Sequence, residues 1–94
     1  MSAYVGHLFN TQMHGGNWRY AQACHLLADT EEELHEMARK LKLKRSWFQD
    51  KNVPHYDLTK TKRAKAVCFG AVELDFKQEG LKLRELRLIR RAQR

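Results

Sequence analysis

The segment ACHLLADTEEELHEMARKL, residues 23–41, decides how this chain begins to fold. Residues 23–28 form a short apolar run of the kind found in buried strands. Thr30 and Glu33 have the spacing of a capping box, which marks the start of a helix. Apolar side chains then recur at helical intervals, at Leu34, Met37, Ala38 and Leu41. The segment therefore predicts a buried strand followed directly by an amphipathic helix.

Strand and helix signals alternate on both sides of this segment. Three other short stretches are typical of strands: residues 4–5, 55–58 and 71–75. Thr59 is placed to cap a second helix over residues 60–69, which ends at Gly70. We expect the inward face of this helix to hold Ala64, Val67 and Cys68. The alternation predicts an α/β fold, a small single domain with a short, largely parallel sheet flanked by two or three helices.

Positive charge is concentrated at the C-terminal end of the chain. The 94 residues suit one domain and carry a formal net charge of +7. Residues 77–94 hold 7 basic and 2 acidic side chains, whereas residues 1–76 hold 11 basic and 9 acidic ones. We therefore divide the chain into an α/β domain, residues 1–76, and a basic helical extension, residues 77–94. Such a charge favours nucleic acid or another phosphate-bearing partner.

Other classes of protein are disfavoured. No apolar run approaches the roughly 20 residues of a membrane-spanning helix, so we expect no membrane partner. The first residues lack the basic and then apolar pattern of a secretory signal peptide. Cys24 and Cys68 are too few for a disulfide scaffold and fit a reducing compartment. We expect a cytoplasmic protein, and the sequence leaves its oligomeric state open.

The triplet His55–Tyr56–Asp57 is the sharpest local signal for chemistry. On an extended strand His55 and Asp57 project to the same side, and His25 can join them if the two strands pair. An imidazole beside a carboxylate can act as acid or base, so His55, Asp57 and His25 are the candidate catalytic residues. The structural alternative is that Asp57 caps the following helix and both histidines lie in the core.

A metal site and a cysteine nucleophile are weaker hypotheses. Suitable ligand atoms come from Cys24, His25, His35, His55 and Asp57, but they do not have the spacing of known zinc motifs. We therefore assign no metal or other cofactor, and a metal near His55 and Asp57 stays an open alternative. Both cysteines lie in apolar segments, where burial suppresses thiol reactivity.

Basic and aromatic side chains supply candidate phosphate and nucleic-acid contacts. The start of the second helix offers free backbone N–H groups beside Lys62 and Arg63. The glycine-containing loop before residue 21 adds His14, Trp18 and Arg19, which suit a nucleobase and its phosphate. The C-terminal extension contributes the candidate nucleic-acid contacts Arg84, Arg87, Arg90 and Arg91.

Four motifs occur in an order that is similar to one known family. They are Cys24–His25–Leu26 with Asp29, Glu33–Leu34–His35, His55–Tyr56–Asp57, and Lys62–Arg63 with Gly70–Ala71–Val72. Together they resemble the phage and bacterial domains called domain of unknown function 4031, over roughly residues 4–73. Fusion of some relatives to HD-type phosphohydrolases implies a nucleotide or nucleic-acid context. The sequence departs from the family at Gly6–His7, where relatives often carry an acidic residue.

The sequence is compatible with three functions. The first is a phage or bacterial accessory domain that binds nucleic acid or a phosphate-bearing ligand. The second is a small phosphoesterase or nuclease-like enzyme that uses the His–Asp residues. The third is a phage protein that binds and inhibits a host protein. The charge favours the first, and the triplet at residues 55–57 favours the second, so the sequence does not decide whether the chain is an enzyme.

Overall fold

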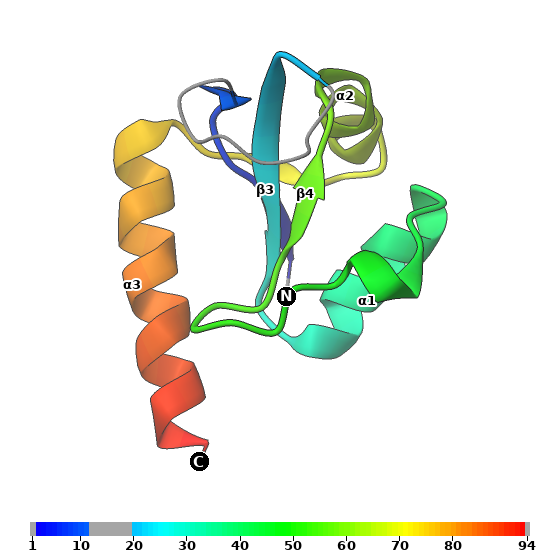
Figure 1. Ribbon diagram of the computed structural model, residues 1–94. Coiled ribbons are helices and arrows are strands. Elements are labelled where there is room, and N and C mark those ends of the chain that lie inside the picture. Colours follow the sequence, from blue (N-terminus) through cyan, green and yellow to red (C-terminus); the bar gives the residue numbers. More distant parts are fainter. Residues whose placement is uncertain (1, 12–19, 94) are drawn as a thin grey trace.

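The computed structural model describes residues 2–11 and 20–93 and has a sheet between two layers of helix (Figure 1). Helices α1 and α2 lie on one side of the sheet, and helix α3 lies on the other. The small α/β domain with three helices is therefore confirmed within the described residues. The elements follow in the order β1 (Ala3–Val5), β2 (Phe9–Asn10), β3 (Gln22–Ala28), α1 (Glu31–Lys40), a 3-10 turn (Arg45–Trp47), β4 (Tyr56–Leu58), α2 (Lys60–Cys68), β5 (Val72–Glu73) and α3 (Phe76–Ala92).

The sheet is mostly antiparallel, so the prediction of a largely parallel sheet is wrong. Strand β3 pairs antiparallel with β1, β2 and β4. Among the described strands, only β1 and β5 pair in parallel. The error has a physical reason: α1 joins β3 to a direct neighbour that runs in the opposite direction. A helix between two strands therefore does not by itself make them parallel.

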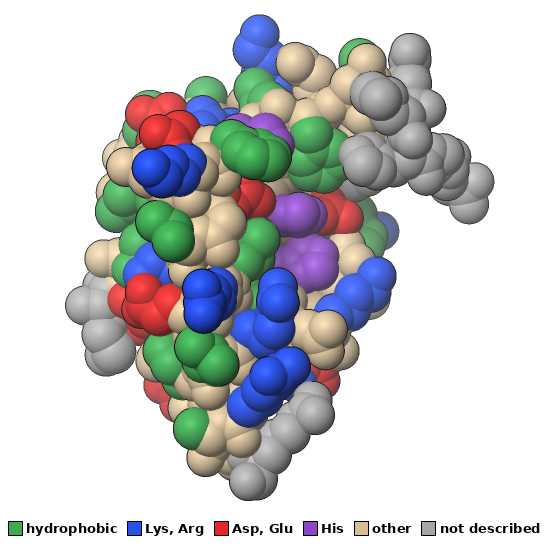
Figure 2. Space-filling model, turned by 90° about the vertical axis from the view of Figure 1, so that its left-hand side faces the viewer, with side chains coloured by type: hydrophobic (Ala, Val, Ile, Leu, Met, Phe, Trp, Pro, Cys, Tyr) green, Lys and Arg blue, Asp and Glu red, His purple; other side chains and the backbone are tan. Residues whose placement is uncertain are grey.

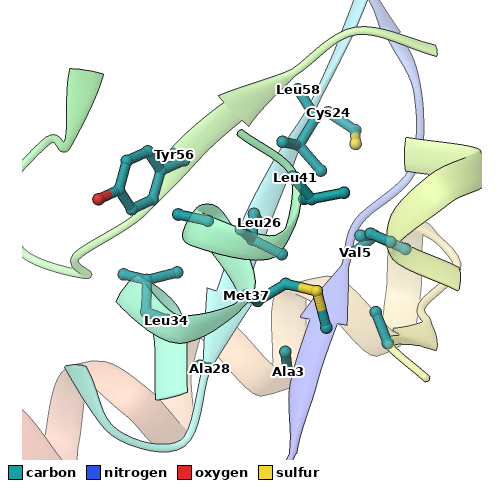
Figure 3. Packing of buried hydrophobic residues seen from close by; sticks show 13 residues of the cluster. Ala3, Val5, Cys24, Leu26, Ala28, Leu34, Met37, Leu41, Tyr56 and Leu58 are labelled. Atoms are coloured by element: carbon teal, nitrogen blue, oxygen red, sulfur yellow. The ribbon is translucent and has the colours of Figure 1, made fainter. Parts of the chain in front are cut away.

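Strand β3 sends alternate side chains to the two faces of the sheet, as a strand must. Cys24 and Leu26 belong to the main hydrophobic core, which the sheet shares with α1 and α2 (Figure 3). Leu27 belongs to a second cluster, which includes Leu86 of α3. His25 lies on the same face as Leu27, and the alternation therefore points a partly exposed histidine toward α3.

The caps of the first two helices agree with the sequence, but the predicted buried face of α2 is confirmed only at Val67, which is partly buried and packs against the core. Thr30 accepts a hydrogen bond from Glu33 N at 3.2 Å, and Thr59 accepts one from Lys62 N at 3.1 Å. Helix α2 buries Ala66, whereas Ala64 and Cys68, which were predicted to face inward, are exposed. Ala66 has a small side chain and is completely buried. The face of α2 that packs on the sheet is therefore the one that holds Ala66, and not the one that holds Ala64 and Cys68.

Helix α3 begins at a capping box and packs against the domain. The Asp75 side chain accepts from Gln78 N, and the Gln78 side chain accepts from Asp75 N. Glu79 is 3% exposed and Leu86 is 7% exposed, so both point inward. Whether residues 1–76 fold without residues 77–94, as the division at residue 76 predicts, stays a prediction. None of the helices in the described part, α3 included, is long and apolar enough to cross a membrane.

Candidate functional site

Antiparallel register brings the histidines and Asp57 together. His25 on β3 lies directly opposite Asp57 on β4, and His55 precedes Asp57 by two residues. The Nε2 atoms of His25 and His55 lie 3.9 and 3.8 Å from Asp57 Oδ1. The two imidazole rings meet edge to face at 4.9 Å between centroids. Pairing of β3 with β4 thus places His25 beside His55 and Asp57, as was predicted for the case in which the two strands pair.

Hydrogen bonds fix the tautomers of both histidines. His55 Nδ1 lies 2.9 Å from the carbonyl oxygen of Val53, and His25 Nδ1 lies 3.0 Å from Glu79 Oε2. A carbonyl and an ionised carboxylate only accept, so each Nδ1 carries the hydrogen. In the neutral rings, both Nε2 atoms then present lone pairs to Asp57. Burial lowers the pKa of His55, which favours its neutral form.

Glu79 is a buried carboxylate held by two histidines. Its Oε1 accepts from His7 N at 2.9 Å and lies 2.5 Å from His7 Nδ1, while Oε2 faces His25. Burial alone raises a carboxyl pKa, but the hydrogen bonds from His25 and His7 outweigh it and lower the pKa of Glu79 to about 2. The carboxylate fits because residue 6 is glycine: a Cβ at Gly6 would overlap the Glu79 carboxyl group.

Asp57 completes a convergence of three acceptor groups. Gln49 Nε2 donates to Asp57 Oδ2 at 2.5 Å, which leaves Oδ1 toward the two histidines. The separations of 3.8 and 3.9 Å are too long for hydrogen bonds. One ligand atom from each of the three side chains lies within 4.8 Å of the others. Two lone pairs and a carboxylate oxygen that face one another favour a cation between them.

The other predicted site residues have partners of their own, are exposed, or lie outside the described residues. Lys62 Nζ donates to Leu41 O, and Arg63 bonds Gly6 O and Glu73 through its guanidinium. Arg90 bonds Asp50. The remaining predicted contacts of α3 are exposed: Arg84, Arg87 and Arg91. Three candidates lie outside the described residues: His14, Trp18 and Arg19.

Sequence reasoning missed four residues around the cluster: Gly6, His7, Gln49 and Glu79. Glu79 lay in the segment assigned to a basic extension, 54 residues from His25. The only sequence signal was an isolated acid in the first turn of a basic helix.

Cys24 is buried, which raises the pKa of its thiol to about 12 and removes it as a nucleophile at neutral pH.

Fold and site together define a small α/β domain with a histidine–carboxylate cluster on the α3 side of its sheet. The family model described as "Protein of unknown function (DUF4031)" matches residues 9–86, and the chain belongs to that family. The matched range includes both histidines, Asp57 and Glu79. No curated protein and no solved structure matches the chain.

Proposed function

We propose that this domain binds one divalent transition-metal ion through His25, His55 and Asp57 and uses it to hydrolyse a phosphate ester. The observation that carries the proposal is the convergence of two Nε2 lone pairs and a carboxylate oxygen. With neither a cation nor a proton between them, these three acceptors repel one another. With a cation, each supplies a ligand atom of a type that zinc, manganese, iron or cobalt accepts.

The geometry suits a metal after a small adjustment. Ligand atoms about 2.1 Å from a tetrahedral ion lie roughly 3.4 Å apart. The distances from the two Nε2 atoms to Asp57 Oδ1 are 3.9 and 3.8 Å, so they need to close by about 0.5 Å. The ligand atoms of the two histidines lie within 4.8 Å of each other and need to close by about 1.4 Å at most. Glu79 bonds Nδ1 of His25, and the Val53 carbonyl bonds Nδ1 of His55. In known metal sites, carboxylate and carbonyl groups in this position orient the metal-bound imidazoles.

Three protein ligands leave a coordination position open for water. His25, His55 and Asp57 would hold the ion, and the chemistry it would supply there is a lower pKa, near 7, for a water in the open position, so that hydroxide forms by loss of a proton to bulk solvent near neutral pH. The resulting hydroxide would attack phosphorus, the P–O ester bond would break, and the leaving alkoxide would take a proton from water. One water is consumed, and a phosphate and an alcohol are released.

Charge favours a phosphate ester over other substrates. Two histidines and a carboxylate also ligate non-haem iron in oxygenases, so the donor set alone does not choose the reaction. The chain carries a net charge of +7. Lysine and arginine side chains border the histidines on one side of the face in Figure 2. One of the cations near the cluster is Lys51, whose charge acts on His55. A polyanion such as nucleic acid fits this surface, which retains nucleic acid as the proposed partner.

Hydrolysis of bis(p-nitrophenyl) phosphate tests the proposal. The chain is stripped of metal with a chelator and then assayed with added Zn²⁺, Mn²⁺ or Co²⁺. We expect metal-dependent release of nitrophenolate that is lost in His55→Ala and in Asp57→Asn. His35→Ala is the matched control, because His35 bonds Tyr56 and Glu31 outside the cluster. Activity that persists in both cluster variants, or that needs no metal, contradicts the proposal.

A further inference from the structure

A row of aromatic rings leads away from the histidine cluster on its α3 side. Phe9 lies 5.3 Å from His25, between ring centroids. His7 follows at 6.2 Å from Phe9, and Phe76 lies edge to face with His7 at 5.1 Å. We call Phe9, His7 and Phe76 the aromatic ledge. The ledge joins three separate segments of the chain: β2, the stretch between β1 and β2, and the first residue of α3.

The ledge is open to solvent at its outer end. Phe76 is 76% exposed, the highest value among the exposed large hydrophobic side chains of the described residues. The capping box of Asp75 and Gln78 fixes the start of α3 and so holds Phe76 in this position. In Figure 2, hydrophobic side chains border the histidines on the side opposite the lysines and arginines. The cluster therefore lies between an apolar border and a cationic one.

We infer that the phosphate ester taken by this site carries an unstacked nucleobase, which stacks on the aromatic ledge. The inference rests on the proposed function, which supplies the phosphate beside the base. Base–aromatic stacking tolerates any base, and a cationic border tracks the phosphates of the same strand. In a duplex the bases are already stacked on each other, so a ledge of this kind selects single strands or free nucleotides over duplexes.

Binding of fluorescent oligonucleotides to the full chain tests the ledge. The probes are fluorescein-labelled (dT)10, an abasic strand of the same length and charge, and a duplex. Phe76→Ala is compared with Phe69→Ala, an exposed phenylalanine at the end of α2, outside the ledge. We expect Phe76→Ala to weaken (dT)10 binding about 5- to 150-fold, the range that stacking of one base supplies. Binding of the abasic strand, and all binding by Phe69→Ala, should stay at the parent level.

Thymidine 5′-monophosphate as a competitor separates the two sources of an unstacked base. If thymidine 5′-monophosphate competes with (dT)10 and Phe76→Ala weakens that competition, free nucleotides are also ligands. If the mononucleotide does not compete, the ledge binds only strands. Equal (dT)10 affinity in the parent and Phe76→Ala overturns the inference, as does an equal loss for the abasic strand.

A parallel assay with bis(p-nitrophenyl) phosphate, which has no base, keeps the two proposals distinguishable. If hydrolysis depends on metal but Phe76→Ala binds (dT)10 as tightly as the parent, only the inference about the aromatic ledge is overturned. Absence of hydrolysis together with the expected loss in Phe76→Ala overturns the metal chemistry and supports the ledge.

Discussion

Replacing Gly6 by alanine tests whether the Glu79 carboxylate orients the site. The new Cβ would overlap the carboxyl group, with its most distant atom, Oε2, at 2.6 Å. The flexible Glu79 side chain can swing away, but it then loses three hydrogen bonds, two from His7 and one from His25.

The expected magnitude follows from those three contacts. Hydrogen bonds to a charged group contribute about 1.5–3 kcal/mol each, and a carboxylate that reaches water recovers part of this. We therefore expect Gly6→Ala to lower the free energy of unfolding by about 2–4 kcal/mol. His25 loses the acceptor that fixes its tautomer, so metal affinity should fall about 10- to 100-fold, as for other outer-partner changes.

Urea unfolding and metal titration of the parent and the variant provide the assay. Gly80→Ala is the matched control, because a Cβ at Gly80 meets no atom within 4 Å. Gly80 lies inside α3, where alanine should raise stability by about 0.5–1 kcal/mol. Parent-like stability and metal affinity in Gly6→Ala would refute the role given to the Glu79 carboxylate.

Three other predictions concern acid stability, thiol reactivity and truncation. The pKa of Glu79 is about 2 in the fold against an ordinary 4.5, so its stabilisation of about 3 kcal/mol is present above pH 4.5 and lost as pH falls through 2. Urea unfolding between pH 2 and 6 should show this slope, and Glu79→Gln should flatten it; equal slopes would be contrary evidence. Cys68 is exposed and Cys24 buried, so a maleimide at neutral pH should label one thiol per folded chain, and Cys68→Ser should abolish labelling. A chain ending at residue 76 lacks Glu79 and Leu86, so it should lose cooperative thermal unfolding; a sharp transition in it would instead support the sequence-based division.

Elements specified by neighbouring residues could be predicted from the sequence. Strand β3 and helix α1 follow from an apolar run and from Thr30 with its capping hydrogen bond, all within residues 22–41. The start of α2 follows in the same way from Thr59. In each case the residues that predict the element lie in the element itself or directly before it.

Strand direction and the surroundings of the site depend on distant residues. The pairing of His25 with Asp57 requires β3 and β4 to be adjacent and antiparallel, and no local pattern specifies this. Glu79 reaches His7 across 72 residues of sequence, through the packing of α3 on the sheet. The period of a strand predicted which side chains share a face, but their partners on α3 came only from the three-dimensional structure.

Titration of the metal-free chain with Co²⁺, followed by its visible absorption, tests whether His25, His55 and Asp57 bind a metal ion. We predict one Co²⁺ ion per chain, displaced by Zn²⁺, with the binding lost in His25→Ala and His55→Ala and kept in His35→Ala. Absence of binding at neutral pH, or binding that survives both cluster substitutions, would contradict a metal centre at His25, His55 and Asp57.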